Sequence, residues 1–318
     1  MGVLRLAFFF GVLSNILYGS SYAVQKLALM SWPPVLLSIA RLAITMLLFS
    51  PFVRLKDLKA ATRKDWIRIL VAAIFGMALP YLVGSYGLQA TDSVNGAMLG
   101  GLEPIATLLL SIALLKERVG GLRIVGIWVG FLGAAWVVTG GDIEQMLGAG
   151  SLRGNALMAA QAVLWAIYTI AAKPTLERVS PMMFSFVTSF VALIAMVPLG
   201  VLEYAALRPS TASLLEATPL AAMLYLAVTV SFVAMILWNH TVRALPSSQV
   251  AVFLFLQPLV GTLAGWFLGE ALLAATVIGG IIISIGVWLS GSTTEQDQAL
   301  RNTRTPATPA TPTGAIQP

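Results

Sequence analysis

The chain has 318 residues, of which 58% are apolar and only 10% are charged, and it carries a net charge of +6. A soluble domain has about 25% charged residues, so these charges are too few to cover a water-facing surface, and the composition predicts a polytopic membrane protein. The absence of Cys and the single His exclude disulfides, thiol nucleophiles and His-based metal clusters, and no cofactor is expected.

Ten apolar stretches are long enough to cross a hydrocarbon core of about 30 Å as helices. They are residues 6–27, 33–52, 67–89, 95–115, 120–139, 154–173, 181–201, 217–240, 247–268 and 272–290. The first stretch lacks a clean small-x-small cleavage site, so we interpret it as a span and not as a signal peptide. The polar, Pro/Thr-rich segment 292–318 is predicted to be a disordered cytoplasmic tail.

The distribution of basic residues predicts the orientation. If the N-terminus is inside, 15 of the 19 Lys and Arg residues lie on the inner side. Lys26, Arg153 and Arg208 lie outside, and Arg41 lies within a span. Because positive residues are retained on the cytoplasmic side, we expect both termini in the cytoplasm. The expected location of the protein is the inner (plasma) membrane of the cell. Basic loops next to anionic lipid also explain the net charge without a nucleic-acid partner.

The two halves of the chain, 1–140 and 151–291, repeat each other. With offsets of 147, 154 and 153 residues, several positions match in order. The matching pairs are Tyr18 and Trp165, Lys26 and Lys173, Glu103 and Gln257, Glu117 and Glu270, Gly126 and Gly279, and Gly133 and Gly286. Five spans per half is an odd number, so the second half must be inverted in the membrane, as in many secondary transporters. We therefore predict an all-α membrane fold of ten helices in two inverted repeats.

The motif GLEPIATLLLSIALLKERV and its echo FLQPLVGTLAGWFLGEALL are each followed by a Gly-rich span. Together with LYGSSYAVQKLAL and SIARLAITMLLF near the start, they resemble the EamA-type transporters of the drug/metabolite transporter superfamily over residues 5–290. The resemblance implies a central cavity and alternating-access transport, mostly export of amino acids, related metabolites or drugs. One departure is Gln257, which stands where the first half has Glu103.

Polar and aromatic side chains recur every three or four residues in the first span, which places them on one helical face. They are Ser14, Tyr18, Ser21 and Gln25, and the matching positions of the sixth span are Gln161, Trp165, Tyr168 and Ala172. Polar side chains avoid lipid, so we expect both stripes to line a cavity in which aromatic rings contact an organic solute. Ordinary hydrogen bonding between helices is the alternative.

Arg41 lies seven residues after Pro34, and Glu103 lies eight after Asn95. Both charges are therefore expected ~11–12 Å from the outer surface. An isolated charge in hydrocarbon is costly, so equal depth predicts an ion pair. Such a pair would fix helix packing. Alternatively, Arg41 binds a substrate carboxylate, or an unpaired Glu103 exchanges a proton during transport.

Three further residues complete the candidate cavity. Tyr81 follows a proline that can bend the third span, Tyr86 lies on the same span, and His240 is its counterpart in the second half. His240 is either a hydrogen-bonded packing residue or a proton relay. Lys26 and Lys173 close the first and sixth spans, where the helix dipole favours a cation that reaches the membrane interface.

Glycines spaced by about four residues let helices approach closely. They are Gly126, Gly130 and Gly133 in the fifth span, and Gly261, Gly265 and Gly269 in the ninth. Packing within one chain explains them, so a monomer is favoured, although a homodimer remains open.

The leading hypothesis is a secondary transporter that exports small organic metabolites such as amino acids. A multidrug or other metabolite permease of the same architecture is the alternative. A membrane-embedded enzyme would need a catalytic dyad or metal cluster, and the sequence offers none, so we predict no enzymatic activity. A non-transporting sensor is less attractive because no soluble domain interrupts the spans. The expected partners are a small-molecule substrate and membrane lipid.

Overall fold

The computed structural model describes residues 2–91, 93–117, 120–139, 152–267 and 274–292. Within these residues the chain is helical and contains no strand. Seven helical segments in the described part are long and apolar enough to cross a membrane. The other three predicted spans contain the shorter apolar helices Leu102–Leu115, Gly121–Gly133 and Val277–Gly286. Each predicted span coincides with helical structure, so the all-α membrane fold is confirmed.

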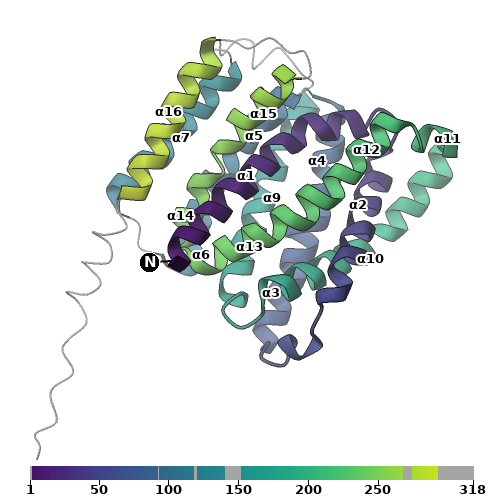
Figure 1. Ribbon diagram of the computed structural model, residues 1–318, viewed down its shortest axis with the longest axis horizontal. Coiled ribbons are helices and arrows are strands. Elements are labelled where there is room, and N and C mark those ends of the chain that lie inside the picture. Colours follow the sequence, from purple (N-terminus) through teal and green to yellow (C-terminus); the bar gives the residue numbers. More distant parts are fainter. Residues whose placement is uncertain (1, 92, 118–119, 140–151, 268–273, 293–318) are drawn as a thin grey trace, which may run out of the picture.

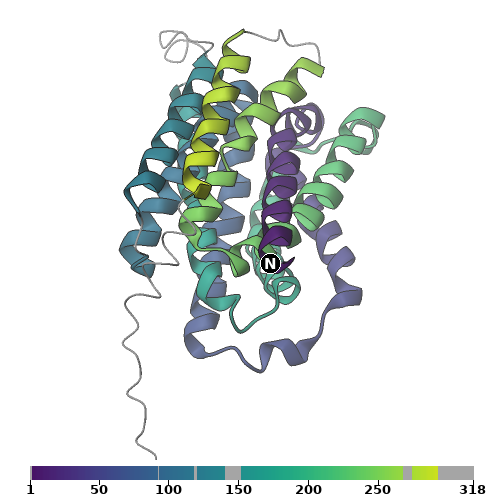
Figure 2. The same cartoon turned by 60° about the vertical axis from the view of Figure 1, so that its left-hand side comes forward.

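The first repeat consists of α1 (Gly2–Ala28), α2 (Pro34–Phe49), α3 (Arg63–Ala73), α4 (Leu79–Gln89), α5 (Ser93–Gly100), α6 (Leu102–Leu115) and α7 (Gly121–Thr139). The second consists of α9 (Leu152–Thr175), α10 (Pro181–Leu207), α11 (Thr211–Leu214), α12 (Ala217–Tyr225), α13 (Met235–Ala244), α14 (Ser247–Phe253), α15 (Leu256–Phe267) and α16 (Ala274–Ser292). Figures 1 and 2 show that α1 begins and α16 ends at the same, lower end of the bundle, as an even number of spans requires. The predicted tail lies almost entirely outside the described residues.

The packing of the helices repeats with the sequence. Helix α1 packs against α13 and α15, and its counterpart α9 packs against α4 and α6. The pairs α2–α10 and α7–α16 join equivalent helices of the two repeats. Figures 1 and 2 show α7 and α16 side by side at one edge of the bundle. This reciprocal packing fits the pseudo-two-fold relation that the sequence repeat predicts.

Two spans are interrupted at equivalent points. The fourth breaks between α5 and α6, and the ninth breaks between α14 and α15. The cause is Pro104 in one and Pro258 in the other, because proline has no N–H to donate and its ring clashes with the carbonyl four residues earlier. Glu103 and Gln257 therefore fall in the first turn of a half-helix. Discontinuous helices of this kind form the substrate sites of many secondary transporters.

The third and eighth spans carry matching π-helical segments, η3 (Ile74–Ala78) and η4 (Leu226–Ala234). The 154-residue offset places the first segment within the second. A π-helical turn inserts an extra residue and is common at functional sites. Its effect here is to rotate the second part of each span relative to the first.

The glycines of α7 and α16 confirm packing within one chain. A Cβ atom at Gly133 would lie 2.9 Å from the carbonyl oxygen of Gly279, and one at Gly286 would lie 2.7 Å from that of Gly126. The contacts are reciprocal between repeat-related positions. Only glycine permits so close an approach of two backbones. In α15, Gly261 faces Gly19 and Ala97 of the same chain, while the predicted Gly269 and the match Glu117–Glu270 involve residues outside the described part.

Lys26 and Lys173 close α1 and α9 as predicted, and each binds the carbonyl groups at the end of a neighbouring helix. The Lys26 ammonium donates to the carbonyl of Leu88 at 3.0 Å, at the end of α4. The Lys173 ammonium donates to the carbonyls of Val242 at 2.8 Å and Leu245 at 2.7 Å, at the end of α13. Each lysine thus satisfies carbonyls that a neighbouring helix end leaves without a partner. The two contacts lie on repeat-related helices.

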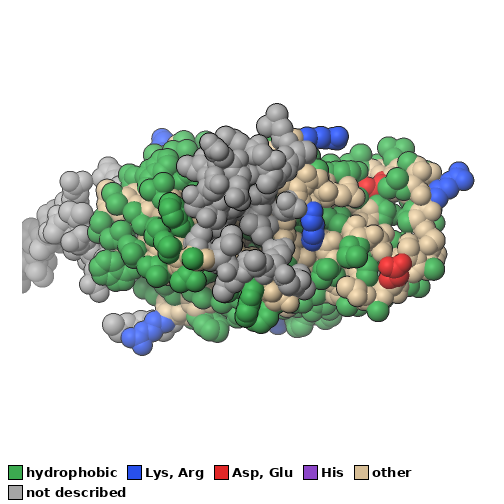
Figure 3. Space-filling model, turned by 90° about the horizontal axis from the view of Figure 1, so that it is seen from above, with side chains coloured by type: hydrophobic (Ala, Val, Ile, Leu, Met, Phe, Trp, Pro, Cys, Tyr) green, Lys and Arg blue, Asp and Glu red, His purple; other side chains and the backbone are tan. Residues whose placement is uncertain are grey.

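At the lower end of the bundle, the wholly buried Asp65 binds two arginines. Arg178 Nε lies 2.9 Å from Asp65 Oδ2, and Arg68 Nη1 lies 3.3 Å from Oδ1. Asp65 also forms a capping box with Thr62 at the start of α3. These contacts fasten the third span to the segment that precedes α10. Among the described residues of the opposite end, Figure 3 shows isolated Lys, Arg, Asp and Glu side chains between apolar side chains and other, uncharged atoms.

Candidate functional site

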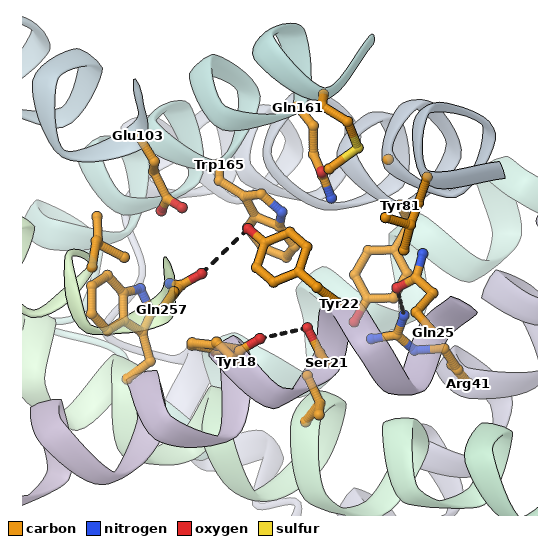
Figure 4. A pocket seen from close by; sticks show the side chains of 16 residues that line it. Tyr18, Ser21, Tyr22, Gln25, Arg41, Tyr81, Glu103, Gln161, Trp165 and Gln257 are labelled. Atoms are coloured by element: carbon orange, nitrogen blue, oxygen red, sulfur yellow. Dashed lines mark hydrogen bonds between the residues drawn. The ribbon is translucent and has the colours of Figure 1, made fainter. Parts of the chain in front are cut away.

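A cavity lies at the centre of the bundle, between the two repeats. Its empty volume is about 740 Å³, counting the part that is open to solvent. The cavity is lined by Tyr18, Ser21, Tyr22, Gln25, Arg41, Tyr81, Gly84, Leu88, Glu103, Met158, Gln161, Trp165, Val230, Trp238, Leu254 and Gln257. Nine of the twelve predicted site residues are among them. Figure 4 shows the polar and aromatic side chains converging on this space.

Helix α1 presents the first predicted stripe to the cavity. Tyr18, Ser21 and Gln25 recur at three and four residues, so they share one face of the helix. The Ser21 hydroxyl donates to the carbonyl of Tyr18 at 2.6 Å. Tyr22 joins the stripe one turn after Tyr18, and this i, i+4 relation was the signal that could have identified it from the sequence. Ser14, which belongs to the predicted stripe, is buried and does not line the cavity, and its hydroxyl donates to the carbonyl of Gly11.

Arg41 is 5% exposed and is held by neutral groups. Its Nη1 donates to Gln25 Oε1 at 3.0 Å, while Nε and Nη2 donate to the Ser231 hydroxyl at 3.3 and 3.1 Å. The guanidinium lies 4.5 Å from the centre of the Tyr81 ring, a cation–π contact. The hydroxyls of Tyr81 and Ser231 are 2.8 Å apart. Sequence reasoning missed Ser231, because only the π-helical segment η4 turns this serine toward Arg41.

Glu103 is 8% exposed and faces the cavity. Among the residues that the structure describes, none forms a hydrogen bond or an ion pair with its carboxyl group. Figure 4 shows Glu103 and Arg41 at opposite ends of the cavity. The predicted ion pair between them is therefore wrong. The prediction used depth along two helices, and equal depth says nothing about separation across the bundle.

Gln257, the counterpart of Glu103, lies at the same end of the cavity as Glu103 (Figure 4). Its Nε2 donates to Asn15 Oδ1 at 2.9 Å, and its Oε1 accepts from the Tyr22 hydroxyl at 3.4 Å. The neutral amide is thus held by α1, whereas the acid at the equivalent position has no partner in the described structure. Equivalent positions of the two repeats therefore carry an acid in the first repeat and a neutral amide in the second.

Aromatic rings form the wall between the two ends. Tyr81 and Trp165 have ring centres 5.9 Å apart, and Tyr18 and Trp238 meet edge to face at 6.3 Å. Tyr168 was predicted to line the cavity but is fully buried behind Trp165, with ring centres 5.9 Å apart. Its hydroxyl accepts a hydrogen bond from Asn239 at 2.9 Å. Tyr168 therefore supports the wall without touching the cavity.

Tyr86 and His240 do not line the cavity, so these two predictions are wrong. Cavity-lining residues on α4 include Gly84 and Leu88, and Tyr86 lies two positions from each, which turns it about 200° away. Its hydroxyl instead donates to a carboxylate of α10, at Glu203. His240 lies two positions after the cavity-lining Trp238, so it is turned away from the cavity in the same way. Its side chain is exposed, and its ring centre is 5.9 Å from that of Phe10.

A bundle of two repeats with broken helices around a central polar cavity is an architecture found in many membrane transporters. The chain belongs to the EamA-like transporter family, which matches it twice, over residues 5–139 and 152–292. The resemblance found in the motifs is thus confirmed, and the chain is a multi-pass membrane transporter.

Individual relatives support this assignment. An "Uncharacterized transporter" of Archaeoglobus fulgidus is 26% identical over 285 residues, which cover 87% of this chain and 94% of that protein. The "Uncharacterized transporter YyaM" of Bacillus subtilis is 25% identical over 72% of this chain and 74% of its own length. A solved crystal structure matches 94% of this chain and 98% of its own, with a TM-score of 0.69 and 19% identity, and it shows the same fold.

Proposed function

We propose that this protein is a secondary transporter that exports small organic metabolites such as amino acids by alternating access. The observation that supports the proposal most is the pair of broken helices that meet at the cavity. Both place a polar side chain, Glu103 or Gln257, in the first turn of a half-helix. The half-helices are joined by turns at Gly101 and at Leu254–Phe255, and non-helical backbone at membrane depth is tolerated only where it is buried in protein or lines a water-filled space. A substrate bound there would contact both repeats.

Alternating access would follow from the pseudo-symmetry. Each repeat contributes one long polar-faced helix, α1 or α9, and one broken helix to the cavity wall. Rocking of one repeat against the other exposes such a shared site to each side of the membrane in turn. The π-helical segments η3 and η4 lie on the two spans that pack against α9 and α1. They are the positions at which these spans would bend.

The proposed location is the inner (plasma) membrane, with both termini in the cytoplasm. The argument is the charge distribution. The lower end of the bundle carries the basic segment 54–68, and basic segments remain on the cytoplasmic side. Fusion of a reporter that is active only in the cytoplasm to either terminus tests this orientation, and activity at one terminus alone would contradict it.

The transport proposal is tested by counterflow in proteoliposomes with a panel of amino acids and amphipathic organic cations. Trp165→Ala opens the cavity wall and is expected to reduce flux, whereas Trp288→Ala is the matched control, because this exposed tryptophan lies on α16 away from the cavity. No flux for any compound, with the protein shown to be folded, would refute the proposal. Equal losses of flux in the two variants would show that the cavity is not the transport site. Uptake into inverted membrane vesicles tests the direction of export.

A multidrug permease is the second candidate, because aromatic side chains dominate the wall around Tyr18, Trp165 and Trp238. Flat apolar cations bind such walls without a specific anionic or cationic partner. The same panel separates the two functions. Flux of amphipathic cations that is unchanged in Arg41→Gln would favour the multidrug hypothesis.

A further inference from the structure

The cavity contains an acidic and a basic side chain that do not pair. Arg41 is 95% buried and contacts only neutral groups, those of Gln25, Ser231 and Tyr81. Glu103 is 92% buried, and its carboxyl group forms no hydrogen bond or ion pair with the described residues. A buried charge without a counter-charge is costly. Both groups face space, so a solute can supply the missing charges.

The two charges lie at opposite ends of the cavity, with the rings of Tyr22 and Trp165 between them (Figure 4). On the cationic side, Tyr81 lies under the guanidinium and its ring centre is 5.9 Å from that of Trp165. The acid lies beyond these rings. A compact zwitterion such as an α-amino acid carries its ammonium and carboxylate groups on one carbon atom. Such a molecule can meet either Arg41 or Glu103, and its other charge remains among aromatic carbon atoms.

We propose that the preferred substrate is an elongated dipolar molecule, with a carboxylate that binds Arg41 and an ammonium group that binds Glu103. The two groups would be joined by an apolar chain that lies along the aromatic wall. ω-Amino acids belong to this class. The proposal rests on the proposed function, because it takes the central cavity as the transport site.

Each part of such a molecule meets suitable chemistry. Arg41 uses one hydrogen of each of its three nitrogens for protein contacts, so N–H groups remain for a carboxylate, which guanidinium groups bind with charge assistance. The carboxyl group of Glu103 accepts hydrogen bonds from an ammonium. Methylene groups between them bury apolar area against Trp165, Tyr18 and Tyr22. One molecule neutralises both charges in a single binding event, which avoids the entropic cost of ordering two separate ions.

A length series tests the proposal. Binding to the purified full-length protein is measured by titration calorimetry and thermal stabilisation with 3-aminopropanoate, 4-aminobutanoate, 6-aminohexanoate and 8-aminooctanoate. Norleucine is the compact zwitterion with the same carbon count as 6-aminohexanoate, and hexanoate and hexylamine carry one charge each. We expect affinity to rise with the distance between the charges. The best long member should bind about tenfold or more tightly than norleucine, hexanoate or hexylamine.

Two variants assign the ends. Arg41→Gln should remove the advantage of the long dipolar ligand over hexylamine, and Glu103→Gln should remove its advantage over hexanoate. Gly121→Ala is the control, because a Cβ there meets no atom within 4 Å and α7 does not line the cavity. Size-exclusion profiles and thermal unfolding check that the variants fold. If one does not, the ligand series with the unaltered protein still decides.

Equal or tighter binding of norleucine, affinity independent of chain length, or no binding of any member would each overturn the proposal. Counterflow distinguishes this failure from failure of the proposed function. Flux of compact or singly charged solutes without a length preference would refute the dipolar substrate and leave transport intact. The absence of flux for every solute would refute transport itself.

Discussion

Gly84→Ala should obstruct the cavity without disturbing the fold. A Cβ at this position on α4 would overlap the side-chain amide of Gln161, whose oxygen would lie 2.8 Å away and whose nitrogen would be closer still. Ordinary contact begins at 3.4 Å. The amide is the end of a flexible side chain and can retreat, and because Gln161 lines the cavity, it retreats into the space for substrate.

Overpacking that cannot be relieved costs about 1–3 kcal/mol. Here rotation of Gln161 relieves most of it in the empty protein, so we expect the free energy of unfolding to fall by less than about 1 kcal/mol. The bound state cannot be relieved in this way, so substrate affinity should fall about tenfold, which corresponds to about 1.4 kcal/mol. Thermal unfolding measures the first effect. Titration with a ligand found by stabilisation screening measures the second.

The double variant Gly84→Ala/Gln161→Ala should recover affinity relative to Gly84→Ala, because the displaced amide is gone. Gln161→Ala alone provides the reference for any contact that Gln161 makes with the ligand. Unchanged affinity in Gly84→Ala, or a double variant no better than Gly84→Ala, would refute this reasoning.

Three other substitutions test the packing. Gly286→Ala places a Cβ 2.6 Å from the backbone nitrogen of Gly130 and should lower the free energy of unfolding by about 1–3 kcal/mol in thermal denaturation; a loss no larger than that of the open-space control Gly121→Ala would contradict the reciprocal glycine contact. Asp65→Asn removes the buried negative charge that pairs with Arg178. The arginine side chain is 40% exposed and can be rehydrated, so we expect the free energy of unfolding to fall by about 1–2 kcal/mol in the same assay. Wild-type stability would argue against the ion pair. Asn239→Leu leaves the hydroxyls of Tyr168 and Ser185 without their donor and should cost about 1–3 kcal/mol, whereas a neutral result would show that these groups find other partners.

The sequence by itself determined the spans, the duplication and the family. Membrane thickness sets a minimum apolar length, so composition along the chain is enough to locate ten spans. The offsets between halves located equivalent positions, and the structure places Gly133 against Gly279 and Gly286 against Gly126 as the repeat implies. The sequence also indicates where the fourth and ninth spans break, because Pro104 and Pro258 cannot continue the hydrogen bonding of a regular helix.

The candidate site was predictable where helical spacing fixes a face, and where a charged residue such as Arg41 or Glu103 lies inside a span. Tyr18, Ser21 and Gln25 follow one stripe, and all three line the cavity. Tyr86 and His240 were chosen because they are polar and match each other in the repeat. Neither argument gives a direction around the helix axis, and both side chains point away from the cavity.

Only the tertiary structure decided which groups meet. The π-helical segment η4 changes the helical phase, and this change brings Ser231 to Arg41; no regular period predicts it. Depth along a helix is a single coordinate, so it could place Arg41 and Glu103 at one level but not on the same side of the aromatic wall. The separation of these two charges, and with it the kind of solute that fits between them, depends on how the ten spans pack.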